Sequence, residues 1–409
     1  MQCNVSLGEA QEILLSRISP LVAEEVCLLE AIGRVLAQDV YARDNIPPFA
    51  RSPLDGFALR AEDTFQASRL KPANLKVIAE VPAGFVLPAP LAPGTAVKIM
   101  TGAPIPDGAN AVVKKEDTDE GGEYVRIYQP IAPDSNIARA GEDVRAGERV
   151  LTRGMVLHSG AVGMLAALGV SRVPVSRKPR VAVLCTGEEL MDVEKSLLPG
   201  KIYNSNLYSL SASIIAAGGE PVLLGTVPDR LEKIAAGLRS GLEEADLVIS
   251  TGGASVGDYD LMYAAFCSME AEVLFRRIAI KPGTPALAAQ KNGKLLVGLS
   301  GNPAAASITF ELLVRPLILK LQGREKWQRP QVTGIMVDDF SKGGGPRRFL
   351  RAAASYEEGL YKVRLAGKQT PGVLKSIVYC NALVDVPADS PPLKAGQEVQ
   401  VILLTDEVN

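Results

Sequence analysis

The chain has 409 residues, of which 47% are hydrophobic and 22% are charged. This length exceeds what one hydrophobic core normally organises, so we expect about two to four domains. The 44 lysines and arginines balance 46 acidic residues, which argues against a protein that binds nucleic acid through clustered cations. His158 is the only histidine, which excludes multi-histidine metal sites, and we interpret it as a structural or surface residue.

Cysteine usage and hydropathy indicate where the protein works. The five cysteines are widely spaced, as expected for reduced thiols in the cytoplasm rather than for a zinc site or a disulfide framework. No stretch has the pattern of a signal peptide, and no apolar run reaches the length of a membrane span. We therefore expect a cytoplasmic protein.

The first 178 residues divide into segments of different character. In residues 1–45, Ser6 and Glu9 form a capping-box pattern ahead of a helix through Ile18, and helical spacing continues over 26–35. Residues 46–141 are rich in proline and glycine and contain short strand-like runs, which predicts a β-rich domain. Residues 142–178 carry further strand and helix signals.

Residues 179–326 carry the clearest pattern in the chain. Four apolar runs end at Cys185, Val227, Ser250 and Leu299, and helical stretches separate them. This alternation predicts a central three-layer α/β/α domain with a mostly parallel sheet. After a polar connector, residues 327–409 contain short strands again, which predicts a β-barrel-like C-terminal domain.

Glycine-rich loops follow the third and fourth apolar runs. Ligands of α/β sheets bind beyond the carboxyl ends of the strands, and glycines let backbone N–H groups approach an anion. Both loops therefore predict a phosphate or oxyanion site, although a tight turn or a simple helix cap explains each loop equally well by itself. The candidate substrate-binding residues in these loops are Gly252, Gly253, Ser255, Gly257, Asp258, Ser300, Gly301, Asn302 and Pro303.

Carboxylates gather at the same predicted edge, namely Glu188, Glu189, Asp229, Asp258 and Asp260. Several carboxylates beside an anion-binding loop call for a cation between them, and their hard oxygen ligands suit Mg²⁺. Singly, Asp229 and Asp260 have the pattern of helix N-caps. Together with Glu189 they predict a metal site.

Four further positions carry weaker signals. Lys281 precedes a rigid Pro-Gly turn and is placed to contact an anion, whereas a solvated lysine is the simpler interpretation of this residue alone. Asp55, Thr101 and Asp143 each lie on a short turn. Taken alone, these three turns are ordinary surface turns.

In order along the chain, these strings resemble the molybdopterin molybdenumtransferases, represented by bacterial MoeA proteins and the E domain of gephyrin. The resemblance covers essentially the whole chain, and its specificity comes from about ten short strings in register. The strings lie at 52–58, 100–106, 141–143, 186–190, 227–229, 251–260, 280–285, 298–303, 347–351 and 376–381.

The resemblance implies a domain plan and a reaction. An elongated linking domain would comprise 1–45 and 142–178, an inserted β-rich domain 46–141, a molybdopterin-binding α/β domain 179–326 and a C-terminal β domain 327–409. A homodimer would form the active cleft between the α/β domain of one subunit and the β-rich domain of its partner. Adenylated molybdopterin would bind, molybdate would enter, Mg²⁺ would assist and AMP would leave. Other cofactor-assembly proteins would be further partners.

The resemblance also carries over roles by matching motif. Catalytic roles are implied for Asp55, Thr101, Asp143, Glu188, Glu189, Asp229, Asp260 and Lys281, and substrate-binding roles for Pro303, Arg351 and Ser376. Many relatives have a second lysine where this chain has Thr284. The lost cation should weaken binding of an anionic substrate, although the hydroxyl can still donate one hydrogen bond.

Two other hypotheses remain open. The same α/β module could adenylate the pterin with ATP, or the chain could be a binding or scaffold protein, as gephyrin also is. The Asp55 turn and the C-terminal β domain favour metal insertion over adenylation. The retained acidic and glycine positions favour an enzyme over a scaffold. The residues do not distinguish molybdate from tungstate.

Overall fold

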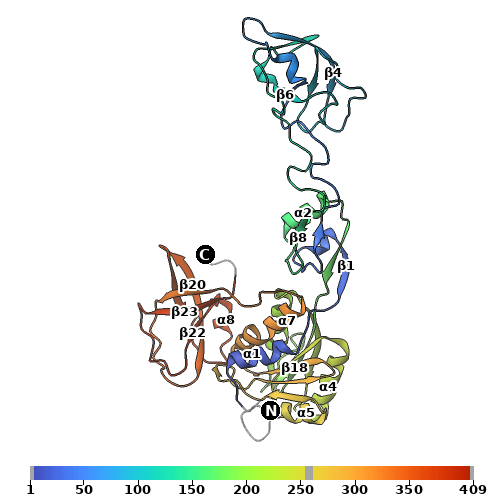
Figure 1. Cartoon of the computed structure of the whole chain (residues 1–409). Coiled ribbons are helices and arrows are strands. Elements are labelled where there is room, and N and C mark those ends of the chain that lie inside the picture. Colours follow the sequence, from blue (N-terminus) through green and yellow to red (C-terminus); the bar gives the residue numbers. More distant parts are fainter. Residues whose placement is uncertain (1–3, 254–260, 406–409) are drawn as a thin grey trace.

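The computed structural model describes residues 4–253 and 261–405, which form an elongated molecule. A β-rich domain lies at one end and a linking part in the middle, and the α/β and C-terminal domains lie together at the other end (Figure 1). Among the described residues, no helix combines the length and hydrophobicity needed to span a membrane. The predicted multidomain arrangement is confirmed, whereas the proposed domain boundaries stay predictions.

The α/β domain is built on a six-stranded sheet in the order β13-β10-β14-β18-β17-β15. The first four strands are parallel, and β17 and β15 are antiparallel to their neighbours, which confirms a mostly parallel sheet. The strands are β10 (Arg180–Thr186), β13 (Glu220–Val227), β14 (Leu247–Thr251), β15 (Glu272–Phe275), β17 (Leu287–Lys291) and β18 (Lys294–Leu299).

Helices cover both faces of this sheet. Alternate residues of β10 enter two different cores: Val183 packs with one layer of helices and Leu184 with the other. The layer on the Val183 side includes α3 (Ser205–Ala216), α6 (Pro303–Thr309) and α7 (Arg315–Leu321). The opposite layer comprises α4 (Leu231–Glu244) and α5 (Leu261–Ser268). The predicted three-layer domain is therefore confirmed.

The N-terminal helix α1 (Leu7–Ser16) packs on this domain rather than on the linking part. Its capping box is formed as predicted, since Ser6 Oγ accepts from the Glu9 N–H and the Glu9 carboxylate accepts from the Ser6 N–H. Leu14 is fully buried in the core that also holds α3 and α7. The first helix thus belongs physically to the α/β domain.

Two β pairs and one helix make up the linking part. Strands β1 (Ala23–Cys27) and β9 (Arg172–Ser176) pair, as do β2 (Val40–Tyr41) and β8 (Arg149–Leu151), beside α2 (Ser159–Ala167). The predicted helix over 26–35 is wrong: only a 3-10 turn, Leu28–Ala31, follows β1. Pairing with a strand about 150 residues away overrides the local helical spacing.

A five-stranded sheet in the order β6-β3-β5-β4-β7 forms the β-rich domain. Its strands are β3 (Gly56–Leu59), β4 (Ala73–Val81), β5 (Thr95–Ile99), β6 (Ala111–Lys114) and β7 (Tyr124–Ile127). Alternation along β3 buries Phe57 on one face and Ala58 on the other, so the sheet has a small core on each side.

In the C-terminal domain, five strands close into a ring, because β20 pairs with both β21 and β22. They are β19 (Gln331–Met336), β20 (Arg347–Glu357), β21 (Leu360–Leu365), β22 (Ala382–Val386) and β23 (Glu398–Leu403), and α8 (Lys375–Val378) lies between β21 and β22. The barrel-like prediction is confirmed, although the long strand β20 was not predicted. The short strand β16 (Ile280–Lys281) of the preceding segment pairs with β20 and ties the two domains together.

Candidate functional site

A cavity of about 790 Å³ lies at the carboxyl ends of β10, β14 and β18. Both predicted glycine loops reach it, one after β14 and the other after β18. The predicted residues that line it are Glu189, Asp229, Gly252, Gly253, Ser300, Gly301, Asn302 and Pro303. Residues from four separate strand ends therefore meet at one place, as expected for a parallel sheet.

Close backbone packing shapes the loop after β14. Gly252 has φ +92°, and a Cβ atom there would lie 2.1 Å from the backbone oxygen of Thr186, at the end of β10. A Cβ on Gly301 would come within 3.4 Å of the Gly252 Cα. The glycines let three strand-end loops approach one another and leave backbone groups facing the cavity.

Asn206, in the first turn of α3, joins two of these loops. Its Nδ2 donates to Thr251 Oγ1 at 2.9 Å and to the Gly301 carbonyl at 2.8 Å. Thr251 Oγ1 in turn donates to the Ser300 carbonyl at 2.9 Å. This bridging residue was not predicted, because a polar residue early in a helix normally indicates a solvated surface.

Two carboxylates, those of Glu189 and Asp229, line the cavity. The N-cap of α4 is Arg230, which makes no side-chain capping bond, so the interpretation of Asp229 as an N-cap is wrong. Two buried oxygens, Thr186 Oγ1 and Asn206 Oδ1, have no hydrogen-bond partner among the described residues. Two carboxylates and uncommitted oxygens form a donor set of the kind Mg²⁺ accepts when substrate phosphates and water complete its shell.

The described part of the chain holds only some of the residues predicted to bind a metal. No group of three histidine, cysteine or acidic side chains there is close enough to hold an ion by itself. The predicted residues Ser255, Gly257, Asp258 and Asp260 lie outside the described residues. Among the described residues, the cavity lining therefore provides two carboxylates, Glu189 and Asp229, and the metal site stays a prediction.

Two other predicted residues of this domain, Glu188 and Lys281, are not part of the cavity lining. Glu188 lines a neighbouring depression of about 400 Å³, and its carbonyl accepts from Lys201 Nζ at 2.5 Å. Lys281 is exposed on β16 and pairs in register with Arg348 of β20. Thr284 Oγ1 donates to the Ile280 carbonyl at 2.6 Å, so its hydroxyl hydrogen is used within the turn.

Arg351 and Ser376, predicted to bind substrate, are buried inside the C-terminal domain. Arg351 Nε donates to Ser376 Oγ at 2.7 Å, and Nη2 donates to the carbonyls of Lys368 and Thr370. These acceptors are neutral, and burial lowers the pKa of the guanidinium. The two residues brace a loop whose Gly372 lines the cavity, a contribution that was not predicted.

Asp55 and Thr101 lie together in the β-rich domain, far from this cavity within one chain (Figure 1). Asp55 Oδ1 accepts from both the backbone N–H and the hydroxyl of Thr101, each at 2.8 Å. These bonds, together with the charge of Lys115, lower the pKa of Asp55, so its exposed carboxylate is ionised at neutral pH. Asp143 is also exposed, on the connection between this domain and the linking part.

Three family models match successive parts of the chain. "MoeA N-terminal region (domain I and II)" matches residues 5–169, "Probable molybdopterin binding domain" matches 182–320, and "MoeA C-terminal region (domain IV)" matches 333–404. The central match contains the cavity-lining loops of the α/β domain.

Whole-chain relatives agree with these matches. The chain is 38% identical over 388 residues to the molybdopterin molybdenumtransferase of Bacillus subtilis (strain 168), covering 94% of this chain and 90% of that protein. It is 37% identical over 399 residues to the protein of the same name from Staphylococcus aureus (strain COL), covering 98% and 95%. The molybdopterin biosynthesis moea protein of Pyrococcus horikosii has a TM-score of 0.88 at 33% identity, covering 99% of this chain and all of that one.

A multidomain chain with this α/β cavity and these relatives is a transferase of molybdenum cofactor biosynthesis. It belongs to the MoeA family, the family of the molybdopterin molybdenumtransferases. The sequence resemblance is thereby confirmed, whereas the roles of individual residues stay predictions.

Replacing Gly252 by alanine tests whether the close loop approach is essential. Gly293→Ala is the matched control, because Gly293 also has positive φ (+76°) but has open space around its Cα. Both variants incur backbone strain, and only Gly252→Ala also pushes against the Thr186 carbonyl. We expect Gly252→Ala to be less stable than the control by about 1–3 kcal/mol in chemical denaturation. Equal stabilities would contradict the packing argument.

A second substitution, Thr101→Val, tests the environment of Asp55. The variant removes the hydroxyl donor and keeps the backbone N–H, so the pKa of Asp55 should rise yet stay below its ordinary value. The stabilisation by these bonds is present at neutral pH and is lost as the pH falls through the folded-state pKa. Carboxyl NMR titration measures this change. Asp339, held by the Ala395 N–H, should be unaffected, and an unchanged Asp55 pKa would disprove the assignment.

Proposed function

We propose that this chain inserts molybdate into adenylated molybdopterin, assisted by Mg²⁺, and releases AMP. The observation that carries the proposal is the cavity in which two carboxylates face glycine loops at the ends of parallel strands. A phosphorylated substrate needs both features, because backbone N–H groups bind its oxygens and a cation offsets its charge against the acids. The choice of substrates is supported by relatives named molybdopterin molybdenumtransferase and by the match to a probable molybdopterin binding domain.

Each part of the cavity has a role in this reaction. The loops at 252–253 and 300–302 bind phosphate or molybdate oxygens through backbone N–H groups. Glu189 and Asp229, with Asp260, would hold Mg²⁺, which polarises the phosphoanhydride when bound. Water attacks the adenylyl phosphorus as the phosphoanhydride P–O bond breaks, so AMP leaves from the pterin phosphate. The two dithiolene thiols bond to molybdenum and give their protons to one molybdate oxygen, which leaves as water without any change in oxidation state. Lys281, with Glu188 beside Glu189, contributes charge at the rim.

A second copy of the chain would complete the cleft. The ionised Asp55 carboxylate is held in place by two hydrogen bonds from Thr101 on an exposed turn. This turn is too far from the α/β cavity of the same chain to contribute to it (Figure 1). In a homodimer, this turn and Asp143 would close over the partner's α/β domain. A shared site of this kind makes the catalytic unit a dimer, which we propose works in the cytoplasm alongside other cofactor-assembly proteins.

One assay separates this proposal from its alternatives. Purified protein is incubated with adenylated molybdopterin, Mg²⁺ and molybdate, and AMP release and bound molybdenum are measured. Molybdate-dependent AMP release supports metal insertion. ATP-dependent adenylation of free molybdopterin would instead support the adenylyltransferase, and failure to bind either pterin would support a scaffold.

Mixing inactive variants tests the shared cleft. Asp55→Ala and Asp229→Ala should each lose activity, because each damages a different half of every site. A heterodimer of the two holds one intact site, so an equilibrated mixture should recover about a quarter of wild-type AMP release.

The pair Glu189→Ala and Asp229→Ala is the matched control for this mixture. Both changes fall on the α/β half, so their heterodimer holds no intact site and should recover nothing. Recovery in neither mixture, with each variant folded, would show that the β-rich domain does not act across subunits.

A further inference from the structure

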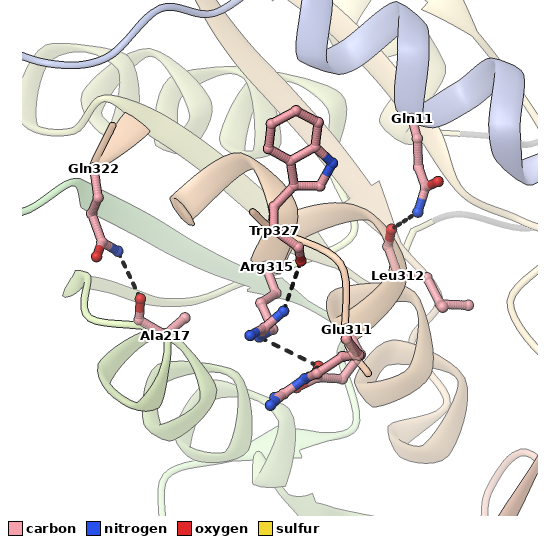
Figure 2. Close-up of polar contacts among 8 residues, drawn as sticks. Gln11, Ala217, Glu311, Leu312, Arg315, Gln322 and Trp327 are labelled. Atoms are coloured by element: carbon pink, nitrogen blue, oxygen red, sulfur yellow. Dashed lines mark hydrogen bonds and ion pairs between the residues drawn. The ribbon is translucent and has the colours of Figure 1, made fainter. Parts of the chain in front are cut away.

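The helical segment that starts at the cavity contains an irregular turn. Residues Phe310–Val314 form a π-helix between α6 and α7. Pro316 has no N–H, so the carbonyl of Leu312, four residues earlier, loses its normal helical donor. Gln11 Nε2, from α1, donates to that carbonyl at 2.7 Å instead (Figure 2). The irregular turn is therefore held in place by its neighbours, and it orients the residue before Leu312, which is Glu311.

Glu311 joins this turn to the connector that enters the C-terminal domain. Its carboxylate accepts from Arg329 Nε at 3.1 Å and Nη2 at 3.3 Å, and it lies 3.9 Å from Arg315. Arg315 Nη1 also donates to the Trp327 carbonyl at 3.0 Å, as Figure 2 shows. All three charged side chains are less than one-fifth exposed, so water screens their attraction only partly.

The C-terminal domain also forms a hydrogen bond with the first turn of this helical segment, at the end next to the cavity. The carbonyl of Pro371 accepts from the Ala304 N–H at 3.0 Å, and the next residue, Gly372, lines the cavity. Ala304 lies in the first turn of α6, directly after Pro303 of the cavity wall. The segment is thus held by the C-terminal domain at Ala304, next to the cavity, and at Glu311, about 10 Å further along the helix axis.

We propose that Glu311 and Arg329 are positioning residues that hold the loop at 367–374 of the C-terminal domain in the wall of the substrate cavity. Neither residue lines the cavity. They hold the start of β19 against the helical segment that begins with α6. The loop at 367–374 contacts the first turn of that same segment, at Ala304. This inference rests on the proposed function for its catalytic consequence, whereas the positioning itself is independent of which substrate binds.

Each domain has its own core, so loosening the junction should leave both folded. The barrel has a core of its own, and Phe349, Leu383 and Ile402 from its strands also pack into the core of the α/β helices, so removing one ion pair should loosen the junction only locally. Removing Arg329 leaves Glu311 still paired with Arg315, which avoids a buried unpaired carboxylate. The expected effect is a smaller population of molecules whose loop is seated in the cavity wall. Apparent affinity falls in proportion to that population, whereas the chemical step in seated molecules is unchanged.

The test uses full-length Arg329→Gln, Glu311→Gln and the double variant. Hydrogen exchange of the peptide covering 366–378 should accelerate by about fivefold or more in each. Exchange in the double variant should be no faster than in Glu311→Gln, because both substitutions remove the same Glu311–Arg329 contact. KM for adenylated molybdopterin should rise in inverse proportion to the seated fraction, with kcat within about twofold. Trp327, the only tryptophan, reports loosening of the connector through increased acrylamide quenching.

Glu272→Gln is the matched control, since it removes a two-pronged bond to Arg17 that joins the end of α1 to β15. It should leave exchange over 366–378 and KM unchanged. Unchanged exchange over 366–378 in both junction variants would overturn the inference, whatever the activity. So would a loss confined to kcat. If the wild-type protein neither binds adenylated molybdopterin nor releases AMP from it, the proposed function is overturned, whereas the exchange result still tests the positioning role.

Discussion

The whole cavity depends on one close backbone approach, that of the Thr251–Gly253 loop to the end of β10. Gly252 lies against the Thr186 carbonyl with no room for a side chain. The third loop, at Ser300–Asn302, comes close to the same glycine, and Asn206 bonds both loops together. Because the backbone is packed this tightly, the side chains of Glu189 and Asp229 can face inward from the rim without filling the space between them.

Much of the α/β domain could be predicted, because its central strands β10, β14 and β18 are almost entirely buried and have nearly continuous apolar sequences. Each of the four predicted apolar runs forms a strand with nearly the expected bounds. The polar residues Thr186, Asp229 and Ser300, which follow three of these runs, line one cavity. Topology does this without further information, since parallel strands present their carboxyl ends at one edge. The location of the site therefore followed from the order of the elements alone.

Contacts between distant segments could not be predicted. Gly372 enters the cavity from a domain about 70 residues further along the chain, and no local pattern marks it. Arg351 is only 1% exposed and bonds to Ser376 and to backbone carbonyls, contacts that no local pattern predicts, and its role in substrate binding stays a prediction. A motif identifies such residues as important, but it does not say whether they touch a ligand or brace the loop that does.

The shape of the molecule explains why function is divided among domains. A narrow linking part separates the Asp55–Thr101 turn from the α/β cavity of the same chain, and each end folds around its own core (Figure 1). The C-terminal domain, by contrast, is fastened directly to the cavity wall through β16, Pro371 and Glu311. Its contribution is fixed within the chain, whereas the contribution of the β-rich domain rests on the proposed association with a second copy. Within one chain, polar contacts at Pro371 and Glu311 and the apolar packing of Phe349, Leu383 and Ile402 together hold the C-terminal domain beside the cavity, so this half of the proposed cleft needs no association.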